Sequence, residues 1–146
     1  MTKIDRLEHR FVKSAPRELE SGILYVSFEY ATVLHLCACG CGRKVVTPLS
    51  PNDWKMTFNG QTVSLHPSIG SWSLPCRSHY VVRDGRIRWA GAWSDEQIQL
   101  GREADRRRKR HQMQTVAKDD TNSASPAVER LNSGSLLSRI ICWFQR

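Results

Sequence analysis

The sequence lacks long hydrophobic runs. None of its apolar stretches approaches the roughly 20 residues that a helix needs to cross a bilayer. Its first residues, MTKIDRLEHR, also lack the hydrophobic core of a secretory signal. We therefore expect a cytoplasmic protein without a transmembrane segment.

Acidic residues are also scarce relative to basic ones. The 146 residues include 22 Lys and Arg but only 14 Asp and Glu, which gives a net charge of +8. Such an excess predicts attraction to nucleic acid, acidic protein or anionic lipid, without selecting one of them. The positive charge is spread along the chain except for one run, Arg106–Arg110. The length of the chain is that of one compact domain.

β-Branched and aromatic residues are concentrated in short segments that alternate with turn-forming residues. Residues 22–36 favour one or two strands, and residues 43–47 favour another. Two hairpins are predicted, around Asn59–Gly60 and around Asp84–Gly85, because these residue pairs tolerate the positive φ that tight hairpin turns require. The pattern predicts a mostly β protein.

A charged helix is predicted toward the C-terminus. Ser94–Gln97 matches a capping box, in which the Ser hydroxyl and the Gln side chain bind the free amides of a helix start. We expect a basic helix over 98–114, packed only by its first turns because its apolar face is thin. Residues 115–135 have the composition of a disordered linker, and 136–144 are abruptly hydrophobic, as in a short docking element.

Cysteines are clustered in the middle of the chain. Cys37, Cys39 and Cys41 fall within five positions, and Cys76 precedes His79 by three residues. In a reducing compartment such a cluster favours metal binding over disulfides. Thiolates two positions apart converge on one ion when the chain turns, and Gly40 and Gly42 permit such a turn. The preferred ligand set for zinc is therefore the four cysteines.

Other ligand sets stay open, because six residues are candidates for a site that takes at most four. His35 and His79 are the two candidates besides the cysteines, and the competing set replaces Cys37 with His79. Four thiolates also suit iron, but the alternating spacing differs from that of iron–sulfur proteins. The cysteines could instead be buried or reactive thiols. The fifth cysteine, Cys142, fits a packing role.

These features divide the chain into four parts. They are an N-terminal lead-in (1–21), a zinc-binding β domain (22–97), a basic helix (98–114), and a disordered linker with a short hydrophobic C-terminal segment (115–146). The predicted fold is a small antiparallel sheet with hairpins, stapled by zinc, plus one C-terminal helix. A metal staple suits this size, because burial alone stabilises a small core only marginally.

Four motifs in the middle of the chain occur in a specific order. They are His-Leu-Cys-Ala-Cys-Gly-Cys-Gly from His35, Pro-Leu-Ser-Pro-Asn-Asp-Trp from Pro48, His-Pro-Ser-Ile-Gly from His66, and Cys-Arg-Ser-His-Tyr from Cys76. Over residues 22–97 they resemble the bacterial family called domain of unknown function 6527. Its members are found beside bacterial ubiquitin-like proteins and their activating and conjugating enzymes. The resemblance implies such proteins as partners, and a role in ubiquitin-like conjugation or its reversal in phage defence.

Histidines beside a metal site also suggest hydrolytic chemistry. A nucleophilic serine needs a base within hydrogen-bond reach. Ser68 and Ser78 are the candidate nucleophiles and His79 is the candidate base, with His35 in reserve. Ser68 is preferred because Pro67–Gly70 favours a tight turn, whereas Ser78 would face away from its neighbour His79 on a strand. The first function hypothesis is a zinc-containing peptidase that processes or deconjugates a ubiquitin-like protein.

Two alternatives also contain the metal site. In one, zinc itself is the catalyst, although the nearby acids Glu29 and Asp53 lack metalloprotease spacing. In the other, the protein is a non-catalytic adaptor that docks a ubiquitin-like protein or its conjugating enzyme through Trp54, Trp72 and Trp93.

A third alternative is a zinc domain that binds nucleic acid. The basic run 106–110 would neutralise phosphates, but no recognition-helix motif accompanies it. The candidate site residues also have ordinary structural explanations: a turn serine at position 68, a metal ligand or core histidine at position 79, and core packing for the tryptophans.

Overall fold

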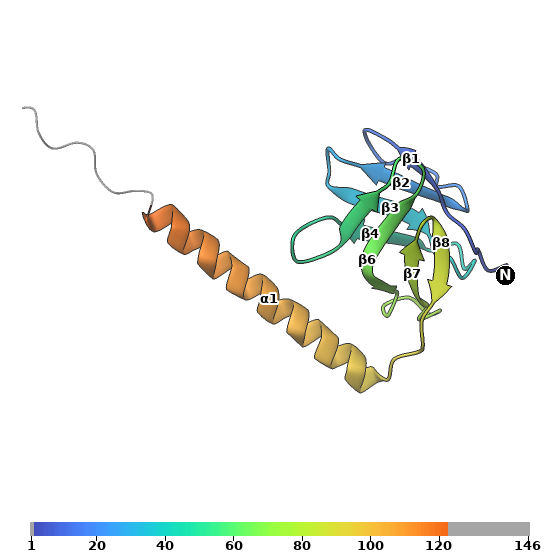
Figure 1. The fold of residues 1–146 in the computed structure, drawn as a ribbon. Helices are drawn as coiled ribbons and strands as arrows, with labels where there is room; N and C mark the ends of the chain where they lie inside the picture. Colours follow the sequence, from blue (N-terminus) through green and yellow to red (C-terminus); the bar gives the residue numbers. More distant parts are fainter. Residues whose placement is uncertain (1, 123–146) are drawn as a thin grey trace, which may run out of the picture. The chain divides into compact units, whose positions relative to one another are not determined.

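The structure, a computed structural model, describes residues 2–122 of the chain, with side chains from residues 2 to 117 (Figure 1). The strands in this part are β1 (Glu8–Phe11), β2 (Ile23–Ser27), β3 (Thr32–Leu36), β4 (Lys44–Pro48), β5 (Lys55–Phe58), β6 (Val63–Gly70), β7 (His79–Arg83) and β8 (Arg86–Trp89), and the helix is α1 (Asp95–Asn122). The chain divides into two compact units, Met1–Arg110 and His111–Arg146. The eight strands and the beginning of α1 all belong to the first unit.

The strands form two four-stranded sheets. Their order is β1-β2-β3-β4 in the first sheet and β5-β6-β7-β8 in the second. Neighbouring strands are antiparallel except β1 and β2, which are parallel. The predicted mostly β fold with one C-terminal helix is confirmed, although it has two small sheets rather than one and the first sheet is mixed.

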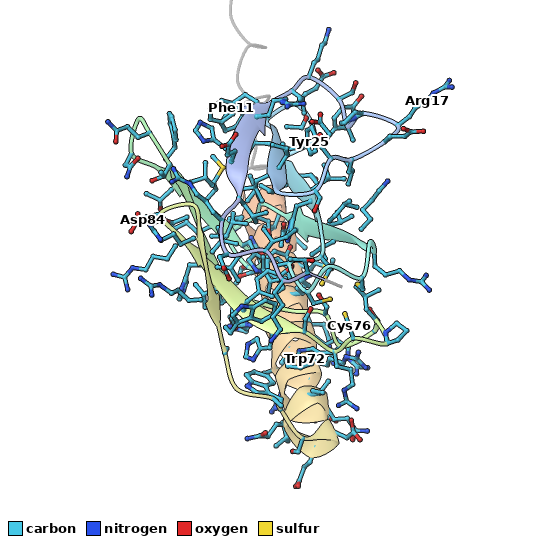
Figure 2. All side chains as sticks on the ribbon, turned by 90° about the vertical axis from the view of Figure 1, so that its right-hand side faces the viewer. Phe11, Arg17, Tyr25, Trp72, Cys76 and Asp84 are labelled. Carbon is cyan, nitrogen blue, oxygen red and sulfur yellow. The ribbon has the colours of Figure 1, made fainter. Side chains whose placement is uncertain are left out.

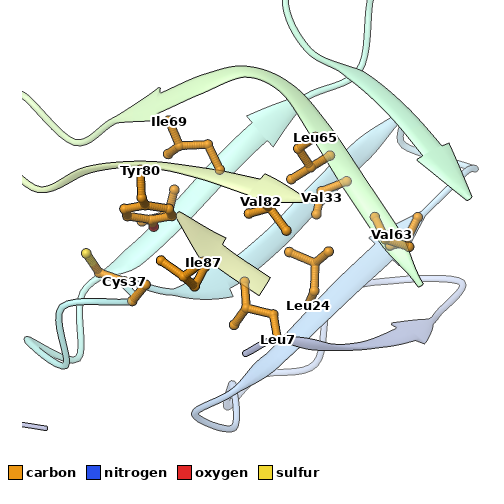
Figure 3. Close-up of a cluster of buried hydrophobic side chains, with 13 residues drawn as sticks. Leu7, Leu24, Val33, Cys37, Val63, Leu65, Ile69, Tyr80, Val82 and Ile87 are labelled. Carbon is orange, nitrogen blue, oxygen red and sulfur yellow. The ribbon is translucent and has the colours of Figure 1, made fainter. Parts of the chain in front are cut away.

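The hydrophobic core is built from side chains of both sheets (Figure 3). Leu24 and Val33 come from the first sheet, and Leu65 and Val82 come from the second. Because successive residues of a strand point to opposite faces, each strand of the second sheet sends alternate side chains outward. The outward residues of β6 and β7 include those of the candidate site.

Both predicted hairpins are present. The first hairpin is longer than the predicted two-residue turn, because residues 59–62 connect β5 and β6 and the Asn59 amide donates to the Thr62 carbonyl. Gly60 has a φ of 92°, but Asn59 does not have a positive φ. Asp84 and Gly85 connect β7 and β8, both with positive φ, at 52° and 70°. Turns with positive φ match the right-handed twist of the strands that they join, which explains why these pairs were informative.

The N-terminal segment differs from the prediction. Residues 1–21 were expected to be an irregular lead-in, but they contain β1, and Leu7 is buried in the core with 3% of its surface exposed. The backbone of β1 pairs with β2, and the Leu7 amide donates to the Gly85 carbonyl. These pairings are non-local, so the charged local sequence gave little sign of them.

The helix begins as predicted and ends later. The Gln97 amide donates to Ser94 Oγ, and the Ser94 amide donates to Gln97 Oε1, which confirms the capping box. The helix continues to Asn122, beyond 98–114, because residues 115–122 contain neither Gly nor Pro and extending a helix is easier than starting one. The first part of the expected linker is therefore helical.

The rest of the predicted linker, the hydrophobic segment 136–144 and Cys142 lie outside the described residues. Within the described part, no helix is both long and apolar enough to span a bilayer.

We predict that Leu7→Ala lowers the free energy of unfolding by about 2–4 kcal/mol, because a large buried side chain leaves a cavity when truncated. Denaturant unfolding measures the loss, and Glu8→Ala, at an exposed neighbouring position, is the control. Equal stability of the two variants would show that the N-terminal segment is not part of the folded unit.

Candidate functional site

A serine and a histidine meet on neighbouring strands of the second sheet. Ser68 lies in β6 and His79 is the first residue of β7. Ser68 Oγ is 2.9 Å from His79 Nε2. The pairing of β6 with β7 shifts register between Leu65 and Ile69, so Ser68 lies in a bulged part of a strand rather than on the tight turn predicted for Pro67–Gly70.

The other ring nitrogen of His79 determines its tautomer. His79 Nδ1 is 2.8 Å from the carbonyl oxygen of Gly91. A carbonyl oxygen can only accept a hydrogen bond, so in the neutral ring Nδ1 carries the proton and Nε2 has a free lone pair. The Ser68 hydroxyl then donates to Nε2, which is the arrangement that a general base requires.

Two tryptophans hold the imidazole of His79 in place. The ring centroids of Trp72 and Trp93 lie 4.9 Å and 5.3 Å from that of His79, and the two indoles stack at 5.5 Å. Only 8% of the surface of His79 is exposed. Gly70 allows Trp72 to lie this close, because a Cβ at position 70 would stand 2.2 Å from Trp72 Nε1.

Ser68 and His79 open into a cavity of about 420 Å³ in the first unit. Its lining also includes Trp72 and Trp93, and residues of the β4–β5 connection and of the first turns of α1. Trp54 lines this cavity and an adjoining one, so all three tryptophans singled out from the sequence lie around the site. The cavity gives the serine hydroxyl access to a ligand.

Asp53 lines the cavity but does not contact the histidine. Its carboxylate lies 2.5 Å from the Lys109 ammonium and accepts a hydrogen bond from Ser50 Oγ at 2.7 Å. The hydrogen bond from Lys109 holds the pKa of Asp53 below its ordinary value. The orienting partner of His79 is thus the Gly91 carbonyl and not a carboxylate.

The four cysteines preferred from the sequence come together at a second place. Cys37, Cys39, Cys41 and Cys76 have sulfur atoms within 4.8 Å of one another. The sulfur–sulfur distances include 3.4 Å (Cys37–Cys39), 3.7 Å (Cys41–Cys76) and 3.9 Å (Cys37–Cys76). Four sulfurs about 2.3 Å from a tetrahedral zinc ion stand about 3.8 Å apart, so the donor set fits such an ion.

The chain turns around Cys39 and Cys41, as the two neighbouring glycines led us to expect. Gly40 and Gly42 have φ of 82° and 70°, in the left-handed region that favours glycine. A Cβ at position 40 would also stand 2.4 Å from the carbonyl oxygen of Thr2. Glycine therefore allows both the turn and the close approach of the N-terminal backbone.

Two thiols of the cysteine cluster have shifted pKa values. Burial, together with hydrogen bonds to neighbouring sulfurs, raises the pKa of the Cys39 thiol to about 12. Burial acts in the same direction on Cys76, but hydrogen bonds from the Ser78 amide and hydroxyl outweigh it and lower the pKa to about 7. Grouped thiols resist ionising together unless a cation balances their charge.

Ser78 and His35 lie away from the serine–histidine pair. Ser78 Oγ is 2.9 Å from the sulfur of Cys37 and 3.6 Å from that of Cys76, so Ser78 belongs to the cysteine cluster. His35 is fully buried, and its Nε2 is 2.8 Å from the Tyr80 hydroxyl. Burial lowers the pKa of His35 to about 4, so its ring is neutral near pH 7.

A buried histidine that accepts from a serine hydroxyl in an open cavity has the arrangement of a serine hydrolase. Residues 11–90, more than half of the chain, match the model of a family described as bacterial ubiquitination-like system serine protease (BubE). The chain belongs to this family. Neither a comparison with curated proteins nor one with solved structures found a match.

The family match confirms the ubiquitin-like setting that the four motifs predicted. It does not confirm the designation domain of unknown function 6527. Because the family is one of serine proteases, the alternative in which zinc is the catalyst is not supported. The sequence gave no sign of the Gly91 carbonyl, since any residue has a backbone oxygen.

Proposed function

We propose that this chain is a serine peptidase that processes or deconjugates a bacterial ubiquitin-like protein. The observation that supports this function most directly is the 2.9 Å contact between Ser68 Oγ and His79 Nε2 in a chain of this family. Ser68 is the nucleophile and His79 the general base. A ubiquitin-like protein, with its activating and conjugating enzymes, is the expected partner, and the cytoplasm is the expected location.

The proposed reaction begins at the serine hydroxyl. His79 Nε2 takes the proton as Ser68 Oγ forms a bond to the carbonyl carbon at the modifier's C-terminal junction. The Gly91 carbonyl accepts from Nδ1–H and so stabilises the imidazolium that forms.

The peptide or isopeptide bond then breaks. His79 Nε2 returns the proton to the leaving amine, and an acyl ester remains on Ser68. A water molecule, deprotonated by His79, attacks this ester. His79 then returns the proton to Ser68 Oγ as the ester bond breaks and the carboxylate of the modifier is released. The two tryptophans limit the motion of the imidazole, so the base remains aligned through both steps.

In this proposal Cys37, Cys39, Cys41 and Cys76 hold a structural zinc ion. Zinc bound there links the sheets, because Cys37–Cys41 follow β3 of the first sheet and Cys76 precedes β7 of the second. Four thiolates fill a tetrahedral shell, which leaves no position for a water nucleophile. Glu29 and Asp53, the acids considered for a catalytic zinc, are not part of this four-cysteine group among the described residues.

The adaptor and nucleic-acid alternatives have weaker support. An adaptor would not need a histidine base oriented by a carbonyl and aligned with a serine. In the basic run 106–110, Arg108 pairs with Asp105 and Lys109 pairs with Asp53, so part of its charge is already balanced within the protein. The peptidase accounts for more of the geometry than either alternative.

We predict that Ser68→Ala and His79→Ala each lower cleavage of a ubiquitin-like protein with a C-terminal extension by about 10³-fold or more. Metal content should stay at the wild-type level in both, because neither residue is a proposed ligand. Ser64→Ala, on the same strand, is the control and should cleave normally. Wild-type cleavage by Ser68→Ala would contradict the proposed nucleophile.

We also predict about one zinc ion per chain, lost in Cys76→Ser, with a large fall in melting temperature. Chelation should unfold residues 22–92, because a core this small depends on the ion. Metal analysis and circular dichroism measure the two effects. A native spectrum in excess chelator, with the metal removed, would refute the structural role.

A further inference from the structure

Two arginines of the second sheet are opposite each other on neighbouring strands, and a third, outside the named strands, forms a bridge with one of them. Arg83 of β7 pairs with Arg86 of β8, and Arg86 also forms a bridge with Arg6, on the other side of β8. Arg88 follows two residues after Arg86, on the same face of the strand. All four are exposed. We call Arg6, Arg83, Arg86 and Arg88 the arginine face.

The arginine face is the outer face of the sheet. Val82 and Ile87, the neighbours of Arg83 and Arg86 along their strands, are buried in the core with 1% and 7% exposed. Side chains alternate along a strand, so the arginines point away from the core. His79 starts β7 on this outer side, four residues or about 13 Å from Arg83.

No carboxylate in the described part pairs with the arginine face. The four ion pairs found among the described residues involve none of these arginines. Asp84 is adjacent in sequence, but its backbone and carboxylate are engaged by Ser64 Oγ. Asp5 contributes a backbone carbonyl, which accepts from the Ile87 amide.

Such an arrangement costs stability. Like charges directly opposite each other on paired strands are destabilising. The row of Arg6, Arg86 and Arg83 contains two such pairs, because Arg86 lies between the other two. A bound anionic surface would offset this repulsion, and arginine forks suit carboxylates because they form two parallel hydrogen bonds.

We propose that the arginine face docks an acidic surface on the folded body of the ubiquitin-like protein whose C-terminal junction enters the cavity at Ser68. This inference rests on the proposed function. Charge complementarity supports an acidic occupant, because a cationic face unpaired within the described part lies on the same side of the sheet as the serine–histidine pair. Docking there adds binding energy away from the scissile bond and so lowers KM.

Binding can be tested without any cleavage. We would measure the affinity of Ser68→Ala protein for the ubiquitin-like protein of the same bacterial system, with and without Arg86→Glu. The expected result is about tenfold weaker binding, from loss of one cation and gain of one anion at the interface. Unchanged affinity in the variant with Arg86→Glu would contradict the proposal. The matched control is Arg17→Glu, an exposed arginine far from Asp84 in Figure 2.

Cleavage separates docking from chemistry. In otherwise wild-type protein, Arg86→Glu should raise KM for the extended ubiquitin-like protein about tenfold with kcat unchanged, and should leave cleavage of a short junction peptide unchanged. The wild-type kcat/KM for the protein should fall as salt rises, because exposed charges are screened. If the wild type cleaves neither substrate, the proposed function fails, while the binding test still decides on docking.

Stability provides a further readout. Arg86→Glu places an anion between two cations, so its melting temperature should rise by about 2 °C or more. Weaker binding in a more stable protein would exclude misfolding as the cause. An equal loss for the junction peptide would place Arg86 in the catalytic cavity and overturn the proposal. The proposal would also be overturned if Arg86→Glu left binding to the ubiquitin-like protein unchanged but abolished binding to an oligonucleotide.

Discussion

The pairing of β6 with β7 is the constraint on which the rest of the site depends. It pairs Gly70 with His79 and so brings Ser68, two residues earlier, within hydrogen-bond distance of the imidazole. Ser78, just before β7, and the first two residues of β7 then serve three places. Ser78 reaches the cysteine sulfurs, His79 reaches the cavity, and Tyr80 enters the core to meet His35. A shift of one residue in this pairing would exchange these faces.

The cysteine cluster and the serine–histidine pair are therefore coupled through a short segment of chain. Cys76, labelled in Figure 2, is three residues before His79, so an ion bound at the proposed site would also fix where β7 begins. In the proposed enzyme, the metal acts on catalysis only through this placement. The cysteine cluster would thus organise the fold, while Ser68 and His79 would touch the substrate.

Much of this organisation was predictable from the sequence, because local chemistry determines it. Closely spaced cysteines and glycines indicated the cysteine cluster, Asn59–Gly60 and Asp84–Gly85 indicated hairpins, and Ser94–Gln97 indicated a helix start. The family resemblance came from the same ordered motifs. These signals need only neighbouring residues.

The features that were missed depend on contacts between distant residues. β1 is held by pairing with β2, the bulge that replaces the expected turn at Ser68 arises where β6 meets β7, and the partner of His79 is a backbone oxygen of Gly91. The linker composition after Gln114 gave the wrong end for α1, because helix propagation outweighed it as far as Asn122. Opposed arginines likewise become visible only once the strand register is known.

The most direct test of the central claim is to treat the protein with a fluorophosphonate probe and locate the modified residue by mass spectrometry. Such a probe bonds covalently to a serine activated by a base. The account predicts a single adduct on Ser68, absent in His79→Ala. An adduct on Ser78, or no adduct on a folded, metal-loaded protein, would contradict it.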